Sequence, residues 1–291
     1  MHTLFAHKIG VPQTVTIGNF DGGHLGHQAL LQKLCHISKL NQTASTVITF
    51  EPLTSEFFAP QKPRRLMNLR DKTTWVKAQG VDNMRCIPFT TKIATLSAAD
   101  FIQYYLLSSG VTHVVVGDDF RFGHNRQGTP ALLAASGLHI TLLPPIIQEG
   151  RVSSSQIRAL LMTGQFQQAT QALGHPYRLS GVVQYGNQKG RLLGFPTANI
   201  ALNRYLPPLS GVYQVRVLVG EIWYNGIANV GVRPTVDGAH PLCEVHILNF
   251  HQTLYGKRLV LEPTRKIRDE KRFDSLEQLK AQIKLDISTL Q

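Results

Sequence analysis

The chain has 291 residues, a formal net charge of +12 at pH 7, 43% hydrophobic residues and 16% charged residues. This length accommodates two domains with separate cores, and the composition is that of a globular protein. No apolar run is long enough to span a bilayer and the first residues lack a signal-peptide core, so we expect a cytoplasmic protein without a membrane partner.

The cysteines and the net charge further limit which classes of protein and partner fit the sequence. Cys35, Cys86 and Cys243 are far apart and form no CxxC motif, which predicts reduced thiols. The basic charge suits anionic partners, either nucleic acid, acidic lipid or nucleotide substrates. Lys and Arg form no long block and are not interleaved with stacking aromatics, so we expect no nucleic-acid partner.

The first half of the chain alternates predicted strands with predicted helices. Continuous apolar strands between helices are typical of an α/β, Rossmann-like domain with a parallel sheet covered on both faces. Such sheets bind ligands at the carboxyl ends of their strands. The strands are expected at 14–17, 46–50, 114–116 and 140–143, and the helices at 71–79, after Ser97 and after Thr129.

The second half reads as a small, mainly antiparallel β-barrel with a terminal helix. Strand-like segments follow one another there without long helices between them, which is typical of a barrel or sandwich. They lie at 179–185, 212–219, 221–228, 243–248 and 258–261.

Helix signals mark the domain boundary and the end of the chain. Two short helices end at Gly164 and Gly174 in the manner of glycine C-caps, so we divide the chain into domains 1–174 and 175–291. A capping box at 275–278 opens the terminal helix. Its predicted apolar stripe is Leu276, Leu279, Ile283 and Ile287.

A glycine-rich turn carrying His24 and His27 is the most informative motif. It lies between a predicted strand and a predicted helix, where free N–H groups and the positive end of the helix attract phosphates. Imidazole can donate a hydrogen bond to a phosphate oxygen or carry positive charge. The alternatives are a surface pair or two metal ligands, but no third ligand stands nearby at zinc-like spacing.

Two further segments of the first half are candidate ligand sites. Ser154 and Ser155 precede Arg158 by about one helical turn, which suits a polyphosphate clamp, although serines there can simply cap a helix. Asp119, Phe120 and Phe122 follow a strand at the same sheet edge. They form either an acidic turn with buried aromatics or an acceptor-substrate pocket with aromatic walls.

The barrel half carries its own polar pattern. Thr197 and Asn199 are two residues apart and therefore face the same side of a strand, where they could hold a Mg²⁺–phosphate group. Glu244 and His246 share a face for the same reason. A single Glu on a strand is more often a solvated residue than a catalytic one.

The HxGH turn together with the later SSSxIR helix start resembles the HxGH nucleotidyltransferase superfamily, which transfers a nucleotidyl group and releases pyrophosphate. The resemblance implies that His24 and His27 are catalytic and stabilise the α-phosphate and the leaving group. Ser154, Ser155 and Arg158 would hold the outer phosphates, and the implied ATP site also includes Gly18 and Phe20. Ser155 stands where the superfamily often has threonine.

The segment from Gly190 to Asn199 resembles the PTAN motif of riboflavin kinases, and Glu244 falls where that family has its catalytic carboxylate. With both halves in order, the chain resembles the bacterial bifunctional riboflavin kinase/FMN adenylyltransferase family.

The resemblance implies an FMN adenylyltransferase in 1–174, with a flavin site at Asp119, Phe120 and Phe122, and a riboflavin kinase in 175–291. It implies ATP, riboflavin, FMN and FAD as substrates or products, and Mg²⁺ held by Thr197 and Asn199. The kinase ATP site would comprise Gly190, Arg191, Gly194, Thr197 and Asn199.

Two departures and two alternatives stay open. Gly23 stands where valine is usual in the family, and Leu53 where histidine is frequent, which bears on the flavin or nucleotide pocket. One alternative is a nucleotidyltransferase whose barrel only binds flavin. The other is a non-enzymatic flavin sensor or RNA binder. The sequence leaves the oligomeric state open.

Overall fold

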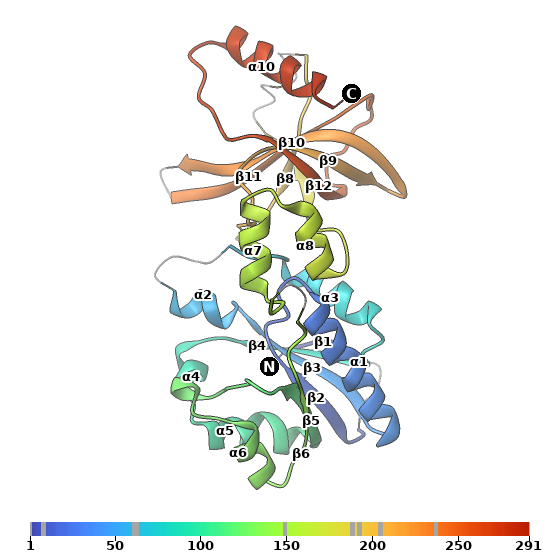
Figure 1. Ribbon diagram of the computed structural model, residues 1–291, viewed down its shortest axis with the longest axis vertical. Coiled ribbons are helices and arrows are strands. Elements are labelled where there is room, and N and C mark those ends of the chain that lie inside the picture. The colour runs from blue at the N-terminus through green and yellow to red at the C-terminus, as the bar shows by residue number, and fades with distance from the viewer. Residues whose placement is uncertain are drawn as a thin grey trace. The chain divides into compact units, whose positions relative to one another are not determined.

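The computed structural model describes residues 2–6, 10–59, 64–147, 150–186, 190, 194–202, 206–235 and 238–290, with the backbone alone at 2, 233–235 and 238–240. Its contacts divide the chain into two compact units (Figure 1). The first comprises Met1–Pro63 and Leu69–Ser154, and the second Arg64–Asn68 and Ser155–Gln291.

The first unit is built on a six-stranded sheet in the order β1-β4-β3-β2-β5-β6. The predicted parallel sheet is confirmed for β2 to β6, whereas β1 pairs antiparallel with β4 at one edge. Neither β1 nor β4 is predicted from the sequence, because Asn83 and Arg85 interrupt the apolar run of β4. The strands are β1 His2–Ala6, β2 Gln13–Ile17, β3 Ala44–Glu51, β4 Asn83–Pro88, β5 Val111–Gly117 and β6 His139–Leu143.

Helices cover both faces of this sheet, as continuous apolar strands require. Val47 and Val115 pack in one core with α1 and α3, while their neighbours Ile48 and Val114 pack in the opposite core. Besides the π-helical turn Ile102–Leu106 and two 3-10 turns, Leu107–Ser109 and His124–Arg126, the helices are α1 Leu25–Leu40, α2 Thr54–Phe58, α3 Leu69–Ala78, α4 Thr91–Ala94, α5 Ala98–Phe101 and α6 Pro130–Ala135.

The second unit contains a closed antiparallel barrel in the order β10-β11-β8-β7-β12-β9, which confirms the predicted architecture. Alternate side chains such as Cys243, Val245 and Ile247 are buried, whereas Glu244 and His246 between them are only half-buried. The elements are β7 Leu179–Gln184, β8 Ala198–Ala201, β9 Gly211–Val219, β10 Ile222–Thr235, β11 Gly238–Ile247, β12 Arg258–Arg268 and α10 Leu276–Ser288.

Other segments belong to the second unit as well. Helices α7 (Ser154–Met162) and α8 (Phe166–Leu173) group with the barrel by their contacts, apart from Ser154. So does Arg64–Asn68, where Arg64 donates to the carbonyl oxygens of Pro207 (3.1 Å) and Leu209 (2.8 Å). The division of the chain into domains at 174–175 stays a prediction.

An ion pair fixes α10 to the barrel. The Nε of Arg268 on β12 donates to both carboxylate oxygens of the buried Asp286, at 3.1 and 3.0 Å, and Gln282 donates to the same carboxylate at 2.8 Å. The predicted apolar stripe of this helix is wrong for Leu276, which is 60% exposed. The helix meets the barrel cavity only from Leu279 onward.

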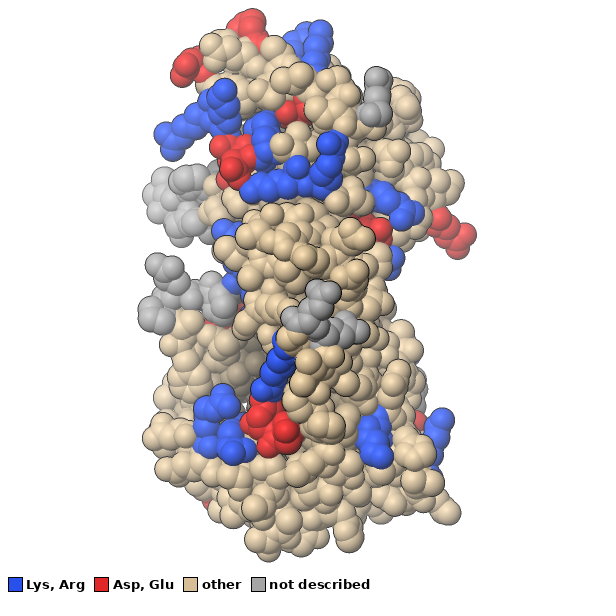
Figure 2. Space-filling view, in the orientation of Figure 1, with Lys and Arg blue, Asp and Glu red and all other residues tan. Residues whose placement is uncertain are grey.

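Surface and cysteine features agree with the composition. Cys35, Cys86 and Cys243 are free thiols, as predicted. On the face shown in Figure 2, the described Lys and Arg side chains form several separate groups, and Asp or Glu side chains lie beside some of them. Within the described residues, the structure contains no helix with the length and hydropathy needed to cross a bilayer.

We expect Asp286→Asn to lower the free energy of unfolding of the barrel by about 3 kcal/mol, because it leaves the Arg268 guanidinium without its buried partner. Asp269→Asn is the control: Asp269 is 86% exposed and pairs with Lys266 at the surface, so its loss should cost less than about 1 kcal/mol. Both free-energy changes are measured by urea unfolding in a Trp75→Phe background, with the fluorescence of Trp223 as the readout. Equal effects of the two variants would contradict the assigned role of the pair.

Candidate active sites

The two histidines of the HxGH turn stack at the start of α1. His24 is the N-cap residue, and its Nδ1 accepts the backbone N–H of His27 at 3.3 Å. The ring centroids are 3.6 Å apart and the planes are inclined by 17°. An accepting Nδ1 places the proton of a neutral imidazole on Nε2. His24 can therefore donate a hydrogen bond from Nε2.

Burial keeps both rings uncharged. It lowers the pKa of His24 to about 4. Burial also lowers the pKa of His27 well below its usual value, and the charges of His24 and Lys72 lower it further. Both imidazoles are neutral at pH 7 in the free protein. Of the two roles that the sequence left open, this favours hydrogen-bond donation over a fixed positive charge.

The glycines of the turn admit close neighbours. Gly23 has a φ of +60°, and a Cβ placed there would lie 2.6 Å from the Trp75 ring. A Cβ at Gly26 would lie 3.2 Å from the His24 ring. The Trp75 side chain on α3 thus occupies the space that a side chain at position 23 would need. This accounts for glycine where the family usually has valine. Leu53, the other departure, is buried in the core.

A cavity of about 300 Å³ opens at the carboxyl ends of the parallel strands, as the sequence analysis predicts. His24, His27, Asp119 and Ser154 line it. The Ser154 hydroxyl donates to the Asp21 carbonyl at 2.7 Å, which ties the two predicted phosphate segments together. Arg151 also lines the cavity and forms an ion pair with Asp119. The sequence analysis did not select Arg151 as a site residue.

The aromatic candidates of this unit do not line the cavity. Phe20 is 1% exposed and lies in the core, with its ring centroid 5.2 Å from that of His27. A Cβ at Gly18 would lie 3.2 Å from the Phe20 ring, so Gly18 leaves room for that ring. Phe122 is buried and Phe120 half-buried against the core on the opposite face of the sheet.

Two predicted phosphate ligands fall in the other unit. Ser155 is exposed and Arg158 half-buried on α7, which groups with the barrel from Ser155 onward. Their proposed contact with ATP stays a prediction.

The larger barrel cavity, about 370 Å³, is lined by residues from five adjacent strands. Glu244 on β11 is paired with Asn199 on β8 and with Asn229 on β10. Asn229 is in turn paired with Val212, and Val212 with Arg268. We refer to these residues, in spatial order Asn199, Glu244, Asn229, Val212 and Arg268, as the cross-strand row.

A second line of side chains lies beside this row, since residues two apart on a strand share a face. It contains Thr197, His246 and Ile227, and all three line the cavity. The predicted shared faces of Thr197 with Asn199 and of Glu244 with His246 are therefore confirmed. His246 Nδ1 lies 2.8 Å from the Pro196 carbonyl oxygen, which orients its ring.

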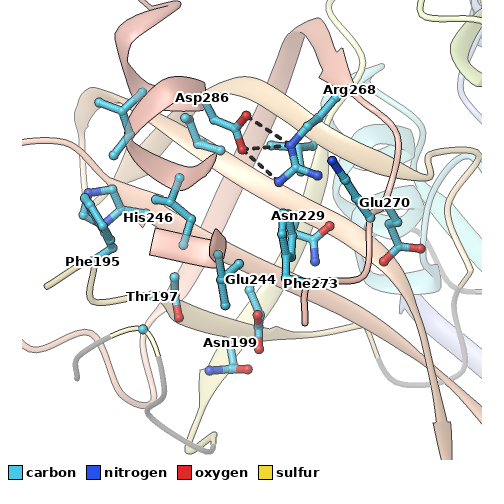
Figure 3. A pocket seen from close by; sticks show the side chains of 17 residues that line it. Phe195, Thr197, Asn199, Asn229, Glu244, His246, Arg268, Glu270, Phe273 and Asp286 are labelled. Carbon is cyan, nitrogen blue, oxygen red and sulfur yellow. Dashed lines mark hydrogen bonds and ion pairs between the residues drawn. The ribbon is translucent and has the colours of Figure 1, made fainter. Parts of the chain in front are cut away.

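Polar groups lie at both ends of this cavity. Figure 3 shows Thr197, Asn199 and Glu244 at one end and the Arg268–Asp286 pair at the other. Apolar side chains from the terminal helix complete the lining. They are Leu279, Ile283 and Ile287. The cavity can thus hold an apolar group together with a polar chain that reaches Glu244.

Two glycines allow the backbone to approach the PTAN side chains. A Cβ at Gly186 would lie 2.2 Å from Asn199 Nδ2, and one at Gly190 would lie 2.4 Å from the Phe195 carbonyl oxygen and 3.1 Å from Thr197 Oγ1. Gly194 has a φ of +86°, which L-residues rarely adopt. Arg191, the remaining predicted member of this site, lies outside the described residues.

A second barrel cavity, of about 120 Å³, adjoins the first at Thr197. Its lining includes Val183, Pro196 and Tyr255. The ring of Tyr185 stacks on that of Tyr255 at 4.0 Å. This cavity could not be predicted from the sequence, because the segments that form it are adjacent only in the closed barrel.

Cys243 is not a nucleophile at neutral pH. Burial raises the pKa of its thiol to about 12, and the neighbouring charge of Glu244 adds to this effect. Among the described residues, no cluster of three or more His, Cys, Asp or Glu side chains could hold a metal ion.

Comparison with known proteins matches each half of the chain, and therefore the residues around each cavity, to a family model. The family model for FAD synthetase matches residues 7–156, and the model for riboflavin kinase matches residues 173–291. The chain belongs to the bifunctional riboflavin kinase/FMN adenylyltransferase family. This confirms the resemblance drawn from the HxGH and PTAN motifs.

Relatives match along nearly the whole chain. The bifunctional riboflavin kinase/FMN adenylyltransferase of Escherichia coli (strain K12) is 43% identical over 280 residues, which is 94% of this chain and 90% of the relative. The protein of that name from Bacillus subtilis (strain 168) is 34% identical over 282 residues, 94% of this chain and 89% of the relative. A crystal structure described as a macrolide-efflux protein from Streptococcus pneumoniae superposes with a TM-score of 0.79 at 30% identity, covering 97% of this chain and 94% of that one.

The neutral state of His24 predicts a pH-dependent stability. Between pH 6.5 and about 4 the unfolded chain binds a proton that folded His24 does not bind, so the free energy of unfolding falls as the pH is lowered through this window. The loss attributable to His24 should reach about 3 kcal/mol. Unfolding titrations of wild type and His24→Gln at several pH values measure it, and a wild-type slope retained in the variant would contradict the assignment.

Proposed function

We propose that the chain makes FAD from riboflavin in two ATP-dependent steps. The barrel phosphorylates riboflavin to FMN, and the α/β unit transfers an adenylyl group from ATP to FMN. The observation that carries this proposal is the pair of separate cavities, each lined by the residues of one motif: His24 and His27 in one, Thr197, Asn199 and Glu244 in the other.

In the barrel, the shape of the two adjoining cavities supports the placement of both substrates. Riboflavin would enter the larger one, with its ring system among the apolar side chains and its ribityl chain directed to Glu244. ATP would place its base in the smaller one beside Tyr255 and its phosphates at Thr197, which both cavities share. The γ-phosphate then lies next to the ribityl terminus.

The phosphoryl transfer needs a base and charge neutralisation. Glu244 would accept the proton of the terminal ribityl hydroxyl, whose oxygen forms a bond to the γ-phosphorus as ADP leaves. The Thr197 hydroxyl and the Asn199 amide oxygen are hard ligands that suit Mg²⁺, which binds few protein groups besides phosphates and water. Bound there, Mg²⁺ would neutralise phosphate charge.

In the α/β unit, a phosphate oxygen of FMN would attack the α-phosphorus of ATP, and pyrophosphate would leave. The neutral His24 can donate from Nε2 to a phosphate oxygen, and the first turn of α1 adds free N–H groups with the positive end of the helix. Ser154, Ser155 and Arg158 as phosphate ligands, and Asp119, Phe120 and Phe122 as a flavin site, are part of this proposal, as is a cytoplasmic location.

The first test follows flavins by chromatography after mixing the protein with riboflavin, ATP and Mg²⁺. FMN should appear first and FAD after it. FMN without FAD would contradict the adenylyl step. Riboflavin binding without ADP release would favour the alternative of a nucleotidyltransferase with a flavin-binding barrel. Absent turnover with salt-sensitive RNA binding would favour the non-enzymatic alternative.

In the same assay we expect His27→Ala to reduce FAD formation from FMN at least about 100-fold while FMN formation stays at the wild-type level. Glu244→Gln should do the reverse, because it removes the base and keeps the shape of the side chain. Each variant thus serves as the folding control for the other unit. Loss of both activities from either single change in a folded protein would contradict two independent sites.

Gly190→Ala should lower riboflavin phosphorylation at least about tenfold, because its Cβ would overlap the Phe195 carbonyl and displace Thr197. Adenylyl transfer to FMN should be unchanged. Gly220→Ala is the control: it strains the backbone at a φ of +64°, but its Cβ meets no atom within 4 Å and the β9–β10 turn does not line either cavity. Steady-state rates of both reactions measure the difference. Similar kinase rates in the two variants would contradict the packing argument.

A further inference from the structure

The larger barrel cavity contains a polar residue that belongs to neither motif. Asn229 lies on β10, is paired directly with Glu244 on β11, and lines the cavity. Its side-chain oxygen Oδ1 is buried and has no hydrogen-bond partner within the described structure. Nearly all buried carbonyl oxygens in folded proteins are hydrogen-bonded, so an acceptor of this kind needs an explanation.

The neighbours of Asn229 in the cross-strand row cannot satisfy it. Val212, on one side, has no polar side-chain atom, and Glu244, on the other, only accepts hydrogen bonds when it is ionised. The row therefore presents three polar side chains in succession, Asn199, Glu244 and Asn229, followed by Val212 and then by Arg268, whose Nε donates to Asp286. Neither paired neighbour supplies a donor, so a molecule that enters the cavity can supply the hydrogen bond that Asn229 lacks.

The position of Asn229 defines the kind of donor. Neighbouring strands are about 4.8 Å apart, so Asn229 lies one strand spacing from the carboxylate that is proposed to accept a proton from the substrate. It lies on the side of the apolar part of the cavity, between Glu244 and Val212. A ligand that joins a terminal hydroxyl at Glu244 to an apolar group at Val212 must pass Asn229 with the chain that links them.

We propose that Asn229 is a specificity-determining residue, whose Oδ1 accepts a hydrogen bond from a secondary hydroxyl of the ribityl chain of riboflavin. This inference rests on the proposed kinase function of the barrel and adds a substrate contact to it. Asn229 discriminates between polyhydroxylated chains and chains without a hydroxyl at this point, because only the former satisfy the buried acceptor. Discrimination of this type is strong where a site is built to hydrogen-bond a substrate hydroxyl.

The test compares Asn229→Leu, which keeps the size of the side chain without its polar atoms, with wild type. Asn225→Leu is the matched control, because Asn225 is an exposed asparagine of the same strand that does not line the cavity. Riboflavin is compared with three analogues, each lacking one secondary ribityl hydroxyl. The KM and kcat for flavin, the KM for ATP, and adenylyl transfer to FMN are measured for each protein.

We expect Asn229→Leu to raise the KM for riboflavin about tenfold, with the KM for ATP and adenylyl transfer unchanged. In wild type, one deoxy analogue should show a similar increase, and in Asn229→Leu the same analogue should show no further increase. Asn229→Asp, which retains an acceptor, should recover most of the affinity for riboflavin and shift the pH–rate profile upward, because it places a second carboxylate beside Glu244.

A riboflavin KM within twofold of wild type in Asn229→Leu would overturn the proposal. An equal increase in KM for every deoxy analogue in both proteins would overturn it as well. If the leucine variant fails to fold, the comparison of the analogues in the wild-type protein decides alone. The contact is contradicted if no deoxy analogue has a higher KM than riboflavin. A wild-type protein that makes no FMN from riboflavin but still binds it contradicts the kinase function. The binding affinities of the analogues then decide the Asn229 contact separately.

Discussion

Strand register is the constraint on which both candidate sites depend. In the barrel, backbone hydrogen bonds align β8, β11, β10, β9 and β12 so that Asn199, Glu244, Asn229, Val212 and Arg268 form one row, although they come from segments up to 69 positions apart in the numbering. A slip of one residue on any of these strands would turn its side chain to the other face. In the α/β unit, the parallel ladder brings the loops after β2, β5 and β6 to one edge.

Close backbone packing at glycine is the second shared feature. At Gly23 the Trp75 ring takes the place of a side chain, and at Gly186 and Gly190 the PTAN side chains lie against the backbone itself. In both arrangements, the Trp75 ring or the PTAN side chains are held by contact with the rigid backbone, and no long flexible side chain is needed to position them. Pre-organisation of this kind lets polar groups act on a phosphate without first reorganising.

Electrostatics differ between the two sites. Of the stacked histidines, His24 is buried and His27 half-buried, and both are neutral, so they contribute directed N–H donors and no net charge. The barrel cavity contains ionisable groups at both ends, with Glu244 at one and the Arg268–Asp286 pair at the other. Arg268 ends the cross-strand row and also holds α10, which couples the floor of the cavity to its apolar cover.

The sequence by itself determined the two-part architecture, most strands, the helix starts at Ser97, Thr129 and Ser275, and the two motifs, because these are properties of neighbouring residues. It did not determine β1 and β4, whose pairing depends on the rest of the sheet, or the exposure of Leu276, which depends on where α10 meets the barrel. Only the tertiary structure decided the charge state of the histidines, the second barrel cavity, the Trp75 contact with Gly23 and the orphan acceptor of Asn229. The physical reason is that burial and cross-strand pairing are set by residues distant in sequence, and no local pattern encodes them.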